Sequence, residues 1–211
     1  MKSTSSANSG KQASTNQESF LERIFKMLNN NKSFPYYQAE RRVDIFINFF
    51  LEDIIQQHTK FKDAIYVAAE FPLKKNSDTD HAAHIDYVMY SESLKCILFV
   101  ELKTDNKSFD KKQIKFYNHE PNFLYWFNEM KKIKMNRFKD KKDFLLEIID
   151  DKIGVITEDL TVQTVVLIPS FYEKNKESNC HIIQLNDIEI ETSFQTEWKL
   201  FKEMILSKLD K

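Results

Sequence analysis

Two neighbouring stretches of sequence decide the fold: AHIDYVMY at residues 83–90 and KCILFVELKT at residues 95–104. The second contains five consecutive apolar residues, Cys96 to Val100, and such a run is typical of a strand buried on both faces. The first has the aromatic and β-branched content of a strand but carries an acid, Asp86, between Ile85 and Tyr87. We therefore expect two successive strands, one of them with a carboxylate inside it.

Two charged residues follow the apolar run, and they share one face of the strand. Side chains alternate across a strand, so Glu101 and Lys103 project from the same side. Charges are costly to bury unless they are paired or placed at an opening. The pattern therefore predicts that this strand leaves the core where a cleft begins.

The segments on either side of these strands predict a mixed sheet flanked by helices, and residues 18–211 are expected to form one domain. Residues 1–17 are polar, with almost nothing to bury, and are predicted to be a disordered tail. Pro72 makes the strand around residues 70–74 an edge or bulged strand. Helices are predicted at about 20–28, 38–57, 108–119, 143–149 and 194–209, and further strands at 164–168 and 181–185.

Composition excludes several classes of protein. The chain has 211 residues and is 42% hydrophobic, which is enough for one domain with a full core. Its two cysteines are too few for a disulfide scaffold, a four-cysteine zinc site or an iron–sulfur cluster, and they predict a cytoplasmic protein. Its two glycines argue against a phosphate-binding loop or a dinucleotide fingerprint. No apolar run is long enough for a membrane span, and no secretory signal is expected at the start.

Three carboxylates are candidates for one metal centre. If the hairpin turns near Asp78, Asp86 lies roughly opposite Glu70, and cross-strand partners are about 5 Å apart. Glu70, Asp86 and Glu101 would then converge, with Lys103 beside them. Carboxylate oxygens suit Mg²⁺ or Mn²⁺, and such an ion can activate water and neutralise charge on a phosphate. Lys103 could orient the attacking water or stabilise negative charge, which suits hydrolysis of a phosphodiester.

Two other patterns bear on the candidate site. His81, His84 and Asp86 suggest a zinc site, but no second His or Cys group stands at ligand spacing. Gln113 and Tyr117 are four residues apart and so share one face of the predicted helix. An amide and a phenol at these positions would either contact a nucleic-acid backbone or brace the site. The sequence leaves these two roles open.

Together these residues resemble the motifs of the PD-(D/E)XK nuclease superfamily. The matching motifs are Ile85-Asp86, then Val100-Glu101-Leu102-Lys103, then Gln113-x-x-x-Tyr117, the last of which is similar to a signature of the RecB-like branch. The similarity covers roughly residues 40–170, and Ile85 stands where the superfamily name has proline. The two cysteines exclude the subtype with a four-cysteine iron–sulfur cluster.

The resemblance implies a restriction-endonuclease-like αβββαβ core with a mixed central sheet. It implies Asp86 and Glu101 as metal ligands, assisted by the Leu102 carbonyl, and Lys103 as the catalytic lysine. It also implies one more acidic residue, for which the candidates are Glu40, Glu52 and Glu70.

A basic stretch follows the motifs. Residues 101–142 hold twelve Lys or Arg and six Asp or Glu, a local net charge of +6 in a chain whose formal net charge is −1. Clusters of this kind attract phosphate backbones. The predicted nucleic-acid contacts are Gln113, Tyr117, Lys131, Lys132, Lys134 and Arg137. Tyr125, Trp126 and Phe127 could stack on the bases of a single strand, although such a triplet is also typical of a core.

The sequence therefore predicts an Mg²⁺- or Mn²⁺-dependent nuclease that acts on DNA in preference to RNA. The resemblance suggests a role in genome defence, mobile elements or repair. The alternative is a catalytically inactive nuclease-like domain that binds nucleic acid or protein. The sequence is compatible with a homodimer but does not define the oligomeric state, the strand form that is cut, or the choice between endo- and exonuclease activity.

Overall fold

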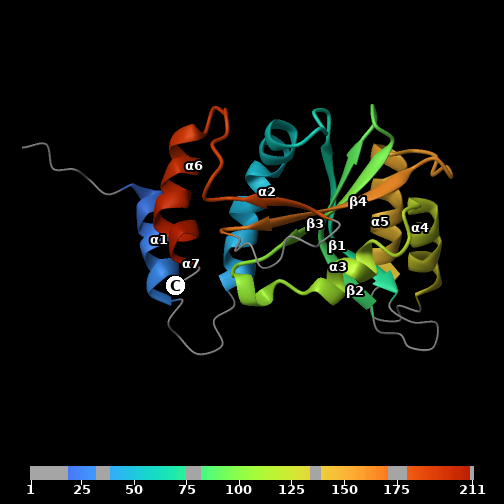
Figure 1. Cartoon of the computed structure of the whole chain (residues 1–211), viewed down its shortest axis with the longest axis horizontal. Coiled ribbons are helices and arrows are strands. Elements are labelled where there is room, and N and C mark those ends of the chain that lie inside the picture. Colours follow the sequence, from blue (N-terminus) through green and yellow to red (C-terminus); the bar gives the residue numbers. More distant parts are fainter. Residues whose placement is uncertain (1–18, 32–38, 75–81, 134–138, 171–179, 210–211) are drawn as a thin grey trace, which may run out of the picture.

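The computed structural model describes residues 19–31, 39–74, 82–133, 139–170 and 180–209 (Figure 1). The predicted tail at residues 1–17 lies outside them. The described helices are α1 (Phe20–Asn31), α2 (Ala39–His58), α3 (Lys111–Tyr117), α4 (Phe123–Lys132), α5 (Lys139–Lys152), α6 (Gln195–Phe201) and α7 (Ser207–Leu209), with a 3₁₀ turn η1 (Asn106–Ser108) and a π-helical segment η3 (Lys202–Leu206). The described strands are β1 (Ile65–Lys74), β2 (Ala82–Ser91), β3 (Cys96–Leu102), β4 (Thr161–Ile168) and β5 (His181–Gln184).

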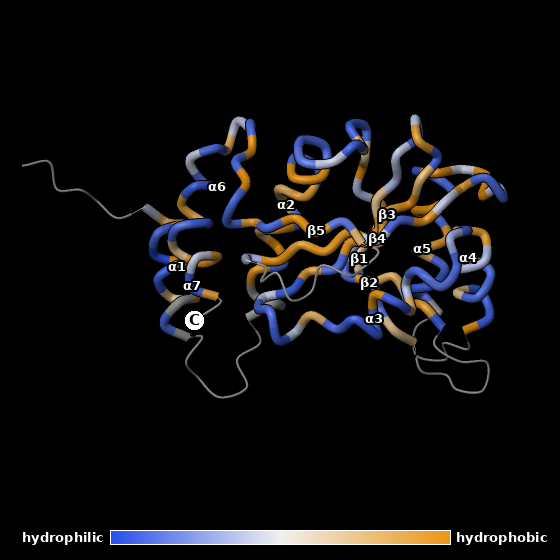
Figure 2. Tube along the Cα trace, viewed as in Figure 1, coloured by the Kyte–Doolittle hydropathy of each residue, from blue (hydrophilic) through white to orange (hydrophobic). Residues whose placement is uncertain are grey.

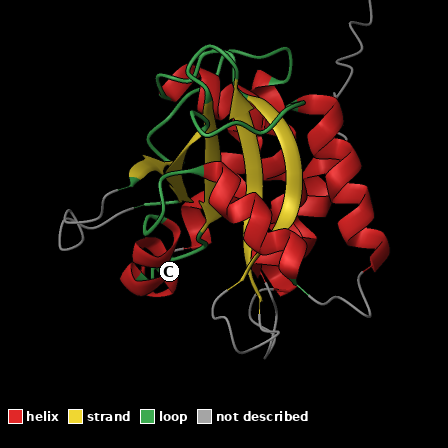
Figure 3. Ribbon diagram, turned by 90° about the vertical axis from the view of Figure 1, so that its right-hand side faces the viewer, coloured by secondary structure: helices red, strands yellow, loops and turns green. Residues whose placement is uncertain are grey.

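The strands form one mixed open sheet in the order β1-β2-β3-β4-β5. β2 pairs antiparallel with both β1 and β3, whereas β4 pairs parallel with both β3 and β5. Figure 3 shows the strands side by side among the helices. The prediction of an α/β fold with a mixed sheet is confirmed, and β1, which contains Pro72, is an edge strand as expected.

Two hydrophobic cores lie on opposite faces of the sheet. The α2-side core packs α1, α2 and α6 against one face, and the α4-side core packs α3, α4 and α5 against the other. On β3, Leu98 and Val100 belong to the α2-side core, while Ile97 and Phe99 belong to the α4-side core. The unbroken apolar run of β3 follows from this burial on both faces. In Figure 2 the hydrophobic residues concentrate along these central strands.

β1 changes the face of its side chains at Glu70. Ala69 packs against the α2-side core, but Phe71, two residues later, belongs to the α4-side core. In a regular strand, residues two apart would share a face. Glu70 has φ 53°, a left-handed conformation that non-glycine residues rarely adopt, and this conformation accounts for the change of face.

β2 makes the same change at Asp86. Ile85 lies in the α4-side core and Tyr87 in the α2-side core. The β1–β2 pairs on either side, Ala69 with Tyr87 and Phe71 with Ile85, keep one register. This register places Asp86 opposite Glu70, as predicted from a hairpin turn near Asp78. Asp86 therefore sits where the sheet reverses its pleat, and this explains how an acid fits between the buried residues Ile85 and Tyr87.

The structure differs from the prediction in three helical regions. Residues 123–132 form α4, which was not predicted, with Asn122 accepting a hydrogen bond from the Leu124 N–H as its N-cap. α5 extends beyond the predicted 143–149 on both sides. The predicted helix at 194–209 contains the π-helical segment η3. No helix in the described ranges is both long and apolar enough to cross a bilayer.

Candidate active site

The candidate site lies where β2 and β3 meet α3. Asp86 is half-buried, and its Oδ2 accepts a hydrogen bond from the Leu102 N–H at 2.7 Å. The β2–β3 ladder pairs Tyr87 with Val100, so Asp86 and Leu102 lie just beyond that pair. The carboxylate of Asp86 thus satisfies a backbone donor at the end of β3 and is held beside Glu101.

Glu101 and Lys103 form a buried ion pair. Lys103 Nζ lies 2.7 Å from Glu101 Oε1, as expected for charges on the same face of a strand. The residues are only 3% and 7% exposed, respectively. The Lys103 backbone N–H donates to the Leu167 carbonyl at 2.8 Å, which extends the pairing with β4 to this residue. The sequence pattern predicted an opening here, whereas the described residues leave this pair almost covered.

Gln113 connects the two charges. Its Oε1 accepts a hydrogen bond from Lys103 Nζ at 3.1 Å, and its Nε2 donates to Glu101 Oε1 at 2.7 Å. An amide offers an acceptor and two donors, so one side chain can bind an ammonium and a carboxylate together. α3 begins at the Asp110 N-cap, whose side chain accepts from the Lys112 N–H, and the helix carries Gln113 over the end of β3.

Tyr117 closes the cluster from the next turn of α3. Its hydroxyl accepts a hydrogen bond from Gln113 Nε2 at 2.5 Å and donates to Glu101 Oε2 at 3.0 Å. The ring is fully buried and contacts the rings of Phe99 and Phe116. Burial raises the pKa of the Tyr117 phenol strongly, and the nearby Glu101 carboxylate raises it further. Tyr117 is therefore a neutral hydrogen-bond donor throughout the physiological pH range.

The five residues of the predicted motifs thus come together from three elements: Asp86, Glu101, Lys103, Gln113 and Tyr117. Of the two roles considered for Gln113 and Tyr117, these contacts favour bracing the site. Contact between nucleic acid and Gln113, which is half-buried, stays a prediction.

Two of the candidates for an additional acid, Glu70 and Glu52, make no described hydrogen bond to the cluster. Glu70 lies across from Asp86 but is exposed, and no group of three His, Cys, Asp or Glu that could hold a metal ion is found among the described residues. Glu52 accepts a hydrogen bond from the Tyr66 N–H at 2.8 Å, at the edge of β1. The side chain of Glu40 lies outside the described residues.

The predicted basic contacts are described only in part. Lys131 is exposed, and its ammonium lies 4.4 Å from the centre of the Phe127 ring. Lys132 is exposed and pairs with Glu129 at 2.5 Å. Lys134 and Arg137 lie outside the described residues, as does His81 of the zinc alternative. Within the aromatic triplet, Trp126 is a core residue, whereas Tyr125 is 41% exposed.

The donor set fits a hard divalent cation. Mg²⁺ usually binds one or two carboxylates and completes its shell with water and phosphate, so Asp86 and Glu101 supply what the protein must contribute. An ionised carboxylate offers about four lone-pair positions. Described donors use three of those on Glu101, two on Oε1 and one on Oε2. Glu101 Oε2 therefore retains one position for a cation.

Comparisons with protein-family models, with curated proteins and with solved structures find no match for this chain. The resemblance to the PD-(D/E)XK nucleases therefore stays a prediction, and the function has to be argued from the residues of the site.

Proposed function

We propose that this chain is a metal-dependent phosphodiesterase that cuts nucleic acid, DNA in preference to RNA, on a restriction-endonuclease-like αβββαβ core. One observation carries the proposal. Two carboxylates and a lysine meet at the end of β3. An amide and a phenol of α3 hydrogen-bond to Glu101 and Lys103, and Asp86 accepts the N–H of Leu102, the residue between them. Such clusters of buried polar groups are expensive and are found preferentially at functional sites.

Asp86 and Glu101 would hold the divalent cation in this proposal. When bound there, Mg²⁺ or Mn²⁺ supplies positive charge for the phosphate and lowers the pKa of a coordinated water. The Leu102 N–H fixes one oxygen of Asp86, and Gln113 and Tyr117 fix Glu101. Ligands whose orientation is set by outer hydrogen bonds need little rearrangement when the ion arrives.

Lys103 would act on the phosphate or on the attacking water. An ammonium has three N–H donors, and within the described residues Lys103 uses two of them, on Glu101 and Gln113. The third is left for an oxygen of the substrate or of water. A fixed cation beside a developing negative charge stabilises the transition state without reorganisation.

The burial of Glu101 and Lys103 supports a second candidate function. A buried ion pair with satisfied hydrogen bonds can be a structural element of the fold. In that case the chain would be a catalytically inactive nuclease-like domain that binds nucleic acid or protein.

The experiment is a cleavage assay on single-stranded DNA, double-stranded DNA and RNA with Mg²⁺, Mn²⁺ or EDTA. The test variant is Asp86→Asn, which keeps an oxygen that can accept from the Leu102 N–H but removes the charge. The matched control is Asp63→Asn. Asp63 also accepts a backbone N–H, that of Ser93, but it lies near the Ser91 end of β2, at the other end of the strands.

We expect cleavage that depends on the metal, is abolished by EDTA and by Asp86→Asn, and is retained in Asp63→Asn. Cleavage that survives Asp86→Asn would show that the activity comes from elsewhere. If no substrate is cut with either metal while the folded protein still binds nucleic acid, the second candidate function is the correct one.

A further inference from the structure

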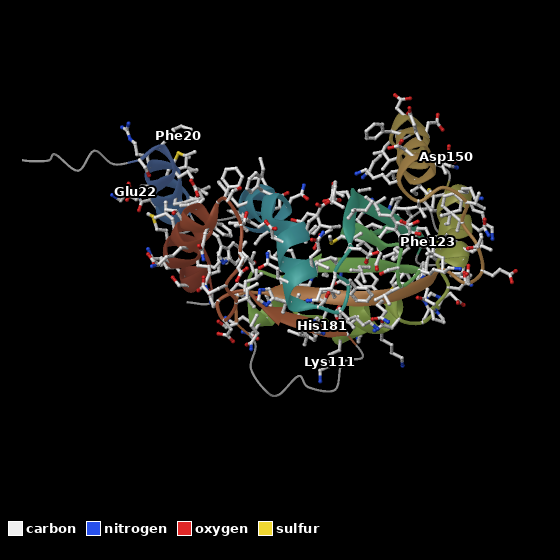
Figure 4. The ribbon with its side chains drawn as sticks, turned by 90° about the horizontal axis from the view of Figure 1, so that it is seen from above. Phe20, Glu22, Lys111, Phe123, Asp150 and His181 are labelled. Carbon is white, nitrogen blue, oxygen red and sulfur yellow. The ribbon has the colours of Figure 1, made fainter. Side chains whose placement is uncertain are left out.

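α3 carries a basic surface behind the residues that brace the site. Gln113 and Tyr117 point to Glu101, whereas Lys111, Lys112 and Lys115 are exposed. Lys115 is four residues from Lys111 and three from Lys112, so the three lysines lie on one side of the helix. Figure 4 shows Lys111 on the outside of the molecule. A single short helix thus joins the candidate site to a positively charged surface.

The charges of these three lysines are not paired with those of other described residues. Within the part of the chain that the structure describes, no carboxylate forms an ion pair with Lys111, Lys112 or Lys115. By contrast, Lys95 pairs with Asp159 and Lys132 pairs with Glu129. Unpaired lysines on one face create a local positive potential that attracts anionic ligands.

An aromatic corner follows directly at the end of α3. The exposed imidazole of His119 stacks on Phe116, with 5.5 Å between centroids and 10° between planes. It also makes edge contacts with Trp126 at 4.6 Å and Tyr125 at 5.6 Å, and its Nδ1 hydrogen-bonds the Phe116 carbonyl at 2.7 Å. His119 is therefore held in one orientation although it is exposed, and the partly exposed Tyr125 ring lies beside it.

The corner is close to the candidate site. The Tyr117 hydroxyl donates to Glu101, and the centre of the Tyr117 ring lies 5.9 Å from the centre of the Phe116 ring. His119 stacks on Phe116. The two turns of α3 therefore contribute both the lysine face and the residues that brace the site. The aromatic corner is formed by residues at the end of α3 and just after it.

We propose that this surface, formed by Lys111, Lys112, Lys115, His119 and Tyr125, binds single-stranded nucleic acid beside the helix that braces the site. The proposal rests on the proposed function, since it names the form of that function's substrate. The lysines contact the phosphates, and His119 and Tyr125 stack on bases. A basic strip beside fixed aromatic rings is the combination that single-strand binders use. In a duplex the faces of internal bases are covered by their neighbours, so rings at this corner reach them only in a single strand.

The test is fluorescence anisotropy with a labelled oligothymidylate and with a labelled DNA duplex, in EDTA, so that binding is measured without cleavage. The basic variant is Lys111→Gln/Lys112→Gln/Lys115→Gln. Its control replaces three exposed lysines elsewhere, Lys60→Gln/Lys62→Gln/Lys199→Gln, with the same change of charge. The aromatic variants are His119→Ala and Tyr125→Ala, compared with His119→Phe, which keeps a ring, and with Phe144→Ala at a side chain that is 61% exposed.

We expect the oligothymidylate to bind more tightly than the duplex. The basic variant should bind more weakly, with a logarithmic salt dependence shallower by about 2, since each phosphate contact on a single strand contributes about 0.7. His119→Ala and Tyr125→Ala should each weaken single-strand binding by roughly 5- to 150-fold. His119→Phe, Phe144→Ala and the control lysine variant should bind like the parent.

Equal losses in the basic variant and its lysine control would overturn the proposal, as would tighter binding of the duplex or unchanged binding in both alanine variants. Because the readout is binding in EDTA, this result is separate from that of the proposed function. A chain that binds the single strand through these residues but cuts nothing would refute only the catalytic assignment.

Discussion

Single residues of the site combine features that are costly to the fold. Glu101 and Lys103 are charged, lie on the same side at the end of β3 and are nearly covered. Four hydrogen bonds link them to each other and to Gln113 and Tyr117. A buried ion pair seldom contributes more stability than a well-packed apolar pair would. Stability alone therefore does not account for this pair.

The phenol of Tyr117 gives a prediction about alkaline pH. Burial and Glu101 raise its pKa in the folded protein, while the unfolded chain titrates near a pKa of about 10. Above that pH the unfolded state binds fewer protons than the folded state. The contribution of Tyr117 to the free energy of unfolding is therefore fully present below about pH 10 and is lost as the pH rises. We expect Tyr117→Phe to lose less stability than the parent, by about 1.4 kcal/mol for each pH unit above 10.

The measurement is urea unfolding of both proteins at several pH values from neutral to alkaline. Tyr66 and Tyr90, whose pKa values burial also raises, contribute equally to both proteins and cancel in the comparison. Parallel loss of stability in the parent and in Tyr117→Phe would contradict the account of Tyr117.

The elements of the sheet explain why the site stands where it does. β1 and β2 reverse their pleat at Glu70 and Asp86, and β3 ends at Leu102 beside that reversal. The Asp86 carboxylate can then accept the Leu102 N–H. The left-handed conformation of Glu70 is therefore linked to the position of Asp86 through the register of the hairpin.

The reversed pleat of β1 predicts that glycine is more stable than alanine at position 70. A non-glycine residue in the left-handed region costs roughly 1–2 kcal/mol, and glycine avoids that cost. We expect Glu70→Gly to be about 1 kcal/mol more stable than Glu70→Ala, because both variants remove the carboxylate but only glycine relieves the backbone. Urea unfolding measures the difference, and an alanine variant as stable as the glycine variant would contradict it.

Sequence periodicity predicts some of these elements but not others. The apolar run of β3 and the spacing of Gln113 and Tyr117 predicted the site, because alternation in strands and the helical repeat fix which residues share a face. The conformation of Glu70 could not be predicted, since glutamate has no preference for the left-handed region. The basic stretch at residues 101–142 does not by itself single out Lys111, Lys112 and Lys115, because they are common surface residues until their helix is placed beside Glu101.

In the molecule as a whole, one sheet separates two hydrophobic cores and also positions the candidate site. The α2-side and α4-side cores cover opposite faces of the sheet, and the site lies at the α3 end of β3, on the α4 side. The α/β class followed from the order of predicted strands and helices. The burial of Glu101 under α3 could not be predicted, because it depends on where the loop after β3 places that helix.

In the proposed function, the Glu101–Lys103 pair is catalytic as well as structural. Removing one partner of a buried ion pair costs about 3–5 kcal/mol, so each variant of this pair must first be shown to be folded. Glu101→Gln and Lys103→Met keep much of the size of the side chains they replace. The double variant Glu101→Gln/Lys103→Met leaves no unpaired charge, and we expect it to lose less stability than the sum of the two single variants.

The most direct test is the single-turnover rate of DNA cleavage in Mg²⁺ by the folded Glu101→Gln, Lys103→Met and double variants, beside Asp63→Asn. We predict that each single variant loses about 100-fold or more in rate, that the double variant does not recover it, and that Asp63→Asn cleaves like the parent. A double variant that regains stability and cleaves at the parent rate would show that the pair only supports the fold, and would contradict the account.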